Sequence, residues 1–178
     1  MKKSTIIKDI QDMLSEALPN VKYIDKDWGQ LGMEQPPVGW PCILIDIEQV
    51  EIRPLNDGNE QHKATVVLTV ANKRKNSSSA HAPIASKEKS METIDLTDEV
   101  HRLVQGFMHP HTYIEHFDAP DGQHFAQIKF DNYTPFQVVS FYKLNDLPGA
   151  EVYAMRYTTR YSNTNETQTT QTTQDENT

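Results

Sequence analysis

The chain has 178 residues, enough for one domain with a single hydrophobic core. Its net charge is -8, from 17 basic and 25 acidic residues, which argues against general nucleic-acid binding and against adhesion to anionic membranes. The only cysteine, Cys42, excludes an internal disulfide and a cysteine-based zinc site. No segment is apolar enough for a signal peptide or a membrane helix, so we expect a chain that folds in the cytoplasm.

The N-terminal part of the chain predicts one helix followed by a loop. Residues 4–18 carry apolar side chains at helical spacing, with Ser4 as the expected N-cap and Pro19 ending the helix. A short strand is predicted within 21–28. Residues 29–39 contain three glycines and two prolines, so they form a loop.

A β-hairpin is predicted next. Its strands are 40–50, whose first half is apolar enough to be covered on both faces, and 63–74. Turn residues at 56–58 join them, and the connection is too short for a crossover helix, so the strands are antiparallel. Residues 75–89 are polar and small without periodicity, which is typical of a flexible loop. The second helix is predicted at 90–108.

The C-terminal part is predicted to be rich in strands. Segments 112–117 and 124–130 flank a turn, whereas 136–144 is apolar and ambiguous. Residues 150–162 alternate with period two, and one face carries Tyr153, Met155, Tyr157, Thr159 and Tyr161. This aromatic face favours core packing or a subunit interface over the stacking of nucleic-acid bases. Residues 162–178 contain no apolar side chain and are predicted to be a disordered, Thr/Gln-rich tail.

The order of these elements indicates an α+β fold with two layers, in which two helices cover a mostly antiparallel β-sheet. We expect one domain, residues 1–161, with the flexible loop 75–89, followed by the tail 162–178.

Histidines are the strongest chemical signal in the sequence. Five of the seven lie within 101–124. His101 is expected on the exposed side of the second helix. The other four are candidate zinc ligands, because a His-x-His pair and hairpin imidazoles can supply three nitrogen donors: His109, His111, His116 and His124. Exposed histidines at a helix end and a turn are the simpler interpretation, so a metal-binding module or enzyme stays an alternative.

Other reactive patterns are weaker. Pro120-Asp121 with Gln127 and Lys129 loosely matches a metal-dependent nuclease pattern, but the second acid is missing. Cys42 lies in an apolar strand, where a thiol behaves as a small hydrophobe. Asp46 and Glu48 are ordinary solvent-facing acids. Without a phosphate loop or nucleophile motif, we expect no enzyme, no catalytic residue and no cofactor.

The amino-acid sequences of three segments resemble those of a known protein family. They are YIDKDWGQLGMEQPPVGWPCILIDIEQV, METIDLTDEVHRLVQGF and VYAMRYTTRYS. Together with the element order over residues 4–161, they resemble the small tail-terminator or tail-completion proteins of long-tailed bacteriophages. Within that family, the sequence most resembles the proteins of Mu-like prophages of Bacteroidetes-type bacteria.

The resemblance implies a structural virion protein without an active site. Such subunits form a homo-oligomeric ring, usually a hexamer, that caps the head-proximal end of the tail and contacts tail tube, sheath and connector proteins. It implies assembly in the bacterial cytoplasm and a final place in the virion tail, with no specific nucleic acid and no membrane. Another head–tail connector component is the alternative. Strand edges and the loop 75–89 are the expected contact elements; that loop and the tail 162–178 differ from the family pattern.

Overall fold

The computed structural model describes residues 2–55, 59–74, 77–108, 111–118, 124–131, 133–144 and 147–163, with the backbone alone for 111–118, 124–131 and 163. Within these ranges, five strands form one sheet in the spatial order β1, β2, β3, β7, β6. β1 runs parallel to β2, and the other neighbouring strands are antiparallel. The strands are β1 (Tyr23–Lys26), β2 (Cys42–Pro54), β3 (Glu60–Lys73), β7 (Ala150–Asn163) and β6 (Gln137–Leu144). A separate hairpin pairs β4 (His111–Asp118) with β5 (His124–Asp131).

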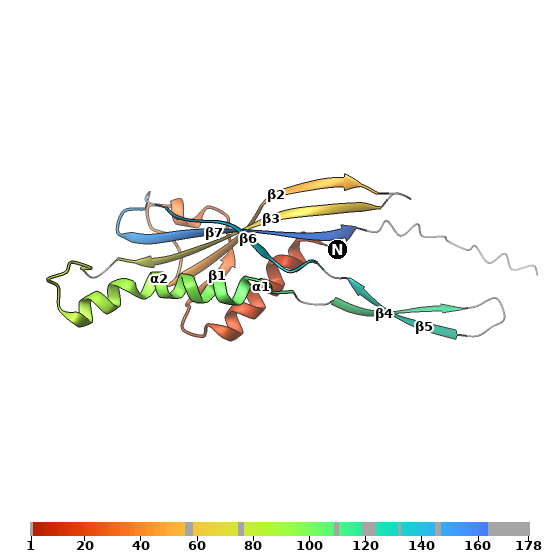
Figure 1. Ribbon diagram of the computed structural model, residues 1–178, viewed down its shortest axis with the longest axis horizontal. Helices are drawn as coiled ribbons and strands as arrows, with labels where there is room; N and C mark the ends of the chain where they lie inside the picture. Colours follow the sequence, from red (N-terminus) through yellow and green to blue (C-terminus); the bar gives the residue numbers. More distant parts are fainter. Residues whose placement is uncertain are drawn as a thin grey trace, which may run out of the picture.

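Two helices cover one face of the five-stranded sheet (Figure 1). α1 (Lys3–Ala17) packs on β1 and β2, and α2 (Ile84–Val104) packs on β3 and β7. The predicted α+β fold, a mostly antiparallel sheet under two helices, is therefore confirmed. In the described part of the chain, no helix combines the length and the hydropathy that crossing a membrane requires.

The main core lies between the helices and the sheet. The alternation predicted for β7 is confirmed, since one of its faces is buried: Tyr153, Met155, Tyr157, Thr159 and Tyr161. β3 contributes its own alternate residues to the same layer, and the helices add residues three and four apart: Ala64, Val66, Leu68 and Val70 from β3, Ile6, Ile10 and Leu14 from α1, and Val100 and Val104 from α2. The aromatic face of β7 is thus core packing, because the helices cover it.

The opposite face of the sheet is covered at one end by the loop 27–41. This loop includes a 3₁₀ turn, η1 (Gln30–Gly32), and lies over a small apolar cluster formed by Cys42, Ala71 and Val152. Gln30, the first residue of η1, is fully buried. Its side-chain nitrogen donates to the carbonyl of Lys26 (3.0 Å), and its side-chain oxygen accepts from the amide of Trp28 (2.8 Å). This cover explains why the start of β2 is apolar on both faces, as the sequence predicted.

α2 begins six residues earlier than its predicted start. Pro83, and not Ser90, precedes the first helical residue, and Pro83 accepts hydrogen bonds from the amides of Ser86 and Lys87 (2.9 and 3.1 Å). Pro83 is the N-cap residue, with φ -54° and ψ 147°, and its missing N–H removes no hydrogen bond of the helix there. The predicted loop 75–89 is therefore wrong in its last six residues, which form the start of α2.

Other boundaries also differ from the prediction. α1 starts at Lys3 after Lys2, so Ser4 is inside the helix. α2 ends at Val104, four residues before the predicted end, and Gly106 follows with a positive φ of 79° that suits glycine. β7 continues to Asn163, so residues 162–163 are strand and not tail. The rest of the tail, 164–178, and the turn residues 56–58 lie outside the described residues.

Candidate functional site

β6 is an edge strand of the five-stranded sheet. β7 pairs with one side of it, and no other described strand pairs with its second side. Three apolar side chains of β6 stay exposed, Val138 at 42%, Val139 at 61% and Phe141 at 46%. The amide of Val138 donates to the side-chain oxygen of Gln105 (3.0 Å). Beyond it, an edge strand carries backbone N–H and C=O groups along its open side, and apolar side chains beside them favour pairing with another strand. The opposite edge, β1, has only four residues.

A β-bulge lies near the start of β6. Val138 pairs with Tyr157 and Ser140 with Arg156, which leaves Val139 as an extra residue in the ladder. A bulge interrupts the ladder, and a lysine on an edge strand also opposes pairing with another strand. Lys143 supplies the lysine here. The regular stretch 140–144 is therefore the part of this edge best suited to a specific partner.

The charge on β6 is balanced within its own sheet. Lys143 donates to the carboxylate of Glu151 on β7, and this hydrogen bond raises the pKa of the Lys143 ammonium. The hydroxyl of Tyr153 donates to the same carboxylate (3.2 Å). Burial, followed by the Glu151 charge, raises the pKa of Tyr153. Glu151 thus holds the Lys143 ammonium against its own sheet. Phe141 is then the most exposed apolar side chain of the stretch 140–144.

A second contact ties β6 to the uncovered face of the sheet. Arg156 of β7 donates two hydrogen bonds to Glu48 of β2 (2.9 and 2.7 Å), across the intervening strand β3. The guanidinium also lies 5.2 Å from the ring centroid of Tyr142 on β6. These contacts link three strands, so β6 is fixed in place by side chains as well as by its ladder.

The structure separates one predicted zinc ligand, His111, from the other two that it describes. His109 lies outside the described residues, and the other three are described by their backbone alone. His111 pairs with Asp131 at one end of the hairpin, and His124 pairs with Asp118 at the other end. His111 and His124 therefore lie seven residue steps apart along the hairpin, a distance of about 23 Å. His116 pairs with Ala126, two residues from His124, so these two histidines are diagonal neighbours across the hairpin. Among the residues whose side chains the structure describes, which do not include this hairpin, no three potential ligands cluster as a metal site.

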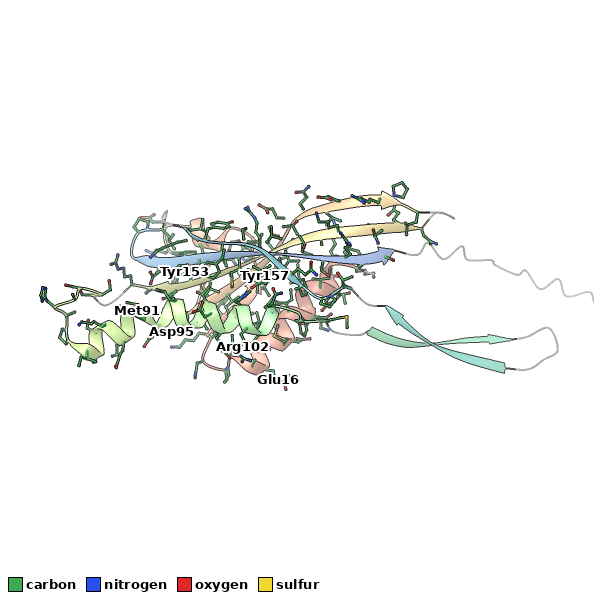
Figure 2. The ribbon with its side chains drawn as sticks, viewed as in Figure 1. Glu16, Met91, Asp95, Arg102, Tyr153 and Tyr157 are labelled. Carbon is green, nitrogen blue, oxygen red and sulfur yellow. The ribbon has the colours of Figure 1, made fainter. Side chains whose placement is uncertain are left out.

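His101 faces the sheet, so its predicted exposed position is wrong. Its Nδ1 lies 2.8 Å from the hydroxyl of Tyr157, and that hydroxyl lies 3.3 Å from the sulfur of Met155. The reason is helical spacing: His101 follows the buried Thr97 by four residues and therefore shares its side of α2. In Figure 2, Tyr157 lies between the sheet and α2.

The remaining sequence candidates have structural roles. Cys42 is fully buried, and burial raises the pKa of its thiol to about 12, so it is a core residue at neutral pH. Glu48 binds Arg156, and Asp46 occupies a partly exposed position on β2. Pro120 and Asp121 of the nuclease-like pattern lie outside the described residues.

A cavity of about 740 Å³ opens where the loop 27–41 meets the turn before β7. The ammonium of Lys73 lies 5.9 Å from the centroid of the Trp40 ring at its wall. Its other walls are formed largely by loop residues, among them Met33, Pro36, Pro148 and Gly149. Glu34 also lines the cavity, but among the described residues no hydrogen bond or ion pair joins its carboxylate to Lys73, so the cavity is a less developed site than the β6 edge.

Sequence reasoning located the segment of β6 but not its role. The segment was ambiguous because Val138, Val139 and Phe141 do not alternate with polar residues. The bulge at Val139 explains this pattern, since an inserted residue shifts the alternation by one. The two adjacent valines, followed by a regular alternation, were the sequence feature that could have indicated this bulge. No family model matches the sequence, and no curated protein matches it either.

Proposed function

We propose that this chain is a structural subunit of a phage or prophage tail, of the tail-terminator type. In this proposal, copies of the chain assemble into a ring, with a hexamer as the expected size. The ring caps the head-proximal end of the tail and contacts the tube or sheath on one side and the connector on the other. Assembly takes place in the bacterial cytoplasm, and the ring remains in the virion tail.

The observation that carries the proposal is the open edge of β6. Val139 and Phe141 are exposed beside an unpaired strand edge, while the ion pair with Glu151 holds Lys143 against the sheet. A fixed edge with exposed apolar side chains favours a contact between strands. A contact that joins two different surfaces of the same chain is head-to-tail, and such contacts close into a ring when the rotation per subunit permits. The α+β fold and the element order agree with the family resemblance.

The oligomeric state of the purified chain tests the proposal. Light scattering and negative-stain microscopy are expected to give rings with one subunit number. Val139→Lys is expected to shift the mass toward the monomer, because it places a charge on the open edge. Ile84→Lys is the matched control: Ile84 is 74% exposed but lies at the start of α2, so its ring is expected to persist. Circular dichroism checks that both variants fold.

The role in the tail needs its own experiment. Purified rings are mixed with tail tubes of the same phage or prophage, assembled without this chain. The expected result is one ring at one end of each tube and a halt in tube growth. A chain that stays monomeric at high concentration, or rings that leave tube length unchanged, would falsify the tail-terminator proposal.

A further inference from the structure

The hairpin of β4 and β5 is a second element without a packing partner. The two strands form their own two-stranded sheet. Among the described elements, they make extensive contacts with each other and with no other helix or strand. Figure 1 shows the hairpin projecting beyond the helices and away from the main sheet. An isolated two-stranded hairpin is marginally stable in water and needs a third strand or a covering helix. The single chain does not supply one in its described part.

The base of this hairpin is firmly attached to the body. Phe136 is fully buried, its amide donates to the carbonyl of Phe107 (3.2 Å), and its carbonyl accepts from Gly106 (2.9 Å). Thr134 adds two hydrogen bonds to Arg160 of β7, at 2.7 and 2.9 Å. The chain is therefore held at the point where the hairpin leaves and returns, so the fold fixes where the hairpin emerges.

We infer that the hairpin of one copy adds to the open edge of β6 in a second copy, which extends that five-stranded sheet by two strands. Two observations select this occupant. β4, β5 and β6 each contain eight residues, so their lengths match. Neither the hairpin nor the open side of β6 pairs with another described strand, and strand addition would pair both at once.

The geometry favours a different copy over the same chain. β6 starts at the base of its own hairpin and runs away from it (Figure 1), so the hairpin cannot lie along it. Pairing of β6 with β6 of another copy would close at a dimer and leave both hairpins uncovered. Pairing of β6 with a hairpin is head-to-tail and leaves a free hairpin and a free edge for further copies. This inference rests on the proposed function, because it names the contact through which the ring would form.

Disulfide trapping between copies tests the contact. One chain carries Ser140→Cys in β6, and a second chain of different length carries one cysteine at a time along β4 or β5. The native Cys42 is buried with a raised thiol pKa, so it does not compete. The expected result is a mixed disulfide at the one position of a hairpin strand directly opposite residue 140. Its sequence neighbours point to the other face, and positions two residues away are too distant. Ile84→Cys at the start of α2 is the control and is expected to give none.

Hydrogen exchange of the unmodified chain provides a second measurement that needs no variant. Amides of β6 and of the hairpin are expected to gain protection together as the protein concentration rises. Rings that form without any mixed disulfide and without joint protection would overturn this contact and leave the tail-terminator proposal standing. Disulfides between two Ser140→Cys chains alone would also overturn it, in favour of a β6–β6 dimer. A strict monomer would overturn both the contact and the ring.

Discussion

The hydroxyl of Tyr157 on β7 lies 2.8 Å from Nδ1 of His101 on α2, inside the layer between helix and sheet. Their rings are also stacked, with centroids 6.0 Å apart. The contact joins residues 56 positions apart in the sequence, and it fixes the height and rotation of α2 over β7. It also keeps the base of the projecting hairpin in place, because α2 leads directly into that base.

Tyr157→Phe is expected to destabilise the fold by about 1–2 kcal/mol, since it removes a hydrogen bond and leaves a half-buried imidazole without its partner. Urea unfolding measures this as a lower midpoint with an unchanged slope. The matched control is Tyr142→Phe. Tyr142 lies on the uncovered face, and its hydroxyl makes no hydrogen bond to the described residues, so its variant should change stability by less than about 0.5 kcal/mol. Equal losses in both variants would contradict a specific role for the His101 contact.

Gly39 tests the attachment of the loop 27–41 to the sheet. A Cβ atom added at Gly39 would lie 2.9 Å from Cβ of Lys22, closer than folded proteins allow, and 3.3 Å from its carbonyl oxygen, a tight contact. Gly39→Ala is therefore expected to lower the free energy of unfolding by about 1–3 kcal/mol. Gly32→Ala is the control in the same loop, since a Cβ there meets no atom within 4 Å. Thermal unfolding of the two variants decides, and a neutral Gly39→Ala would show that the loop can shift freely.

The buried thiol of Cys42 is expected to lower the free energy of unfolding at alkaline pH. An unfolded cysteine ionises near its ordinary pKa of 9.0, whereas burial raises the pKa of Cys42 in the folded chain to about 12. Between these values the unfolded chain releases a proton that the folded chain retains, so the free energy of unfolding falls as the pH rises. Below pH 9 the contribution is fully present. From pH 8 to pH 10 the loss from this thiol is about 1.4 kcal/mol.

The measurement compares wild type and Cys42→Ala by urea unfolding at pH 8 and pH 10. The variant should lose about 1.4 kcal/mol less over this interval, whatever its stability at pH 8. Tyr157 and Tyr161, whose pKa values burial raises above 10, contribute equally to both proteins and act at higher pH. An identical pH dependence in the two proteins would show that the thiol ionises as readily in the folded state.

Most of the fold was predictable because local patterns reflect it. The period-two pattern of β7 and the helical spacing in α1 each specify one buried face, and the structure buries those faces. The early start of α2 was missed because 84–89 lacks an apolar stripe, and Ile84 is 74% exposed. These first turns are helical through Pro83 and backbone hydrogen bonds, which sequence periodicity does not reveal.

The sequence by itself determined the α+β class, the segments of nearly all strands and the burial of Cys42, because each depends on residues close together in the chain. The tertiary structure alone decided that β6 is the open edge, that Arg156 reaches Glu48, and that the hairpin carrying His111 and His124 projects from the body. The physical reason is that strand order, and therefore which backbone groups stay unpaired, depends on the relative burial of whole elements. That relation appears only when distant parts of the chain pack together.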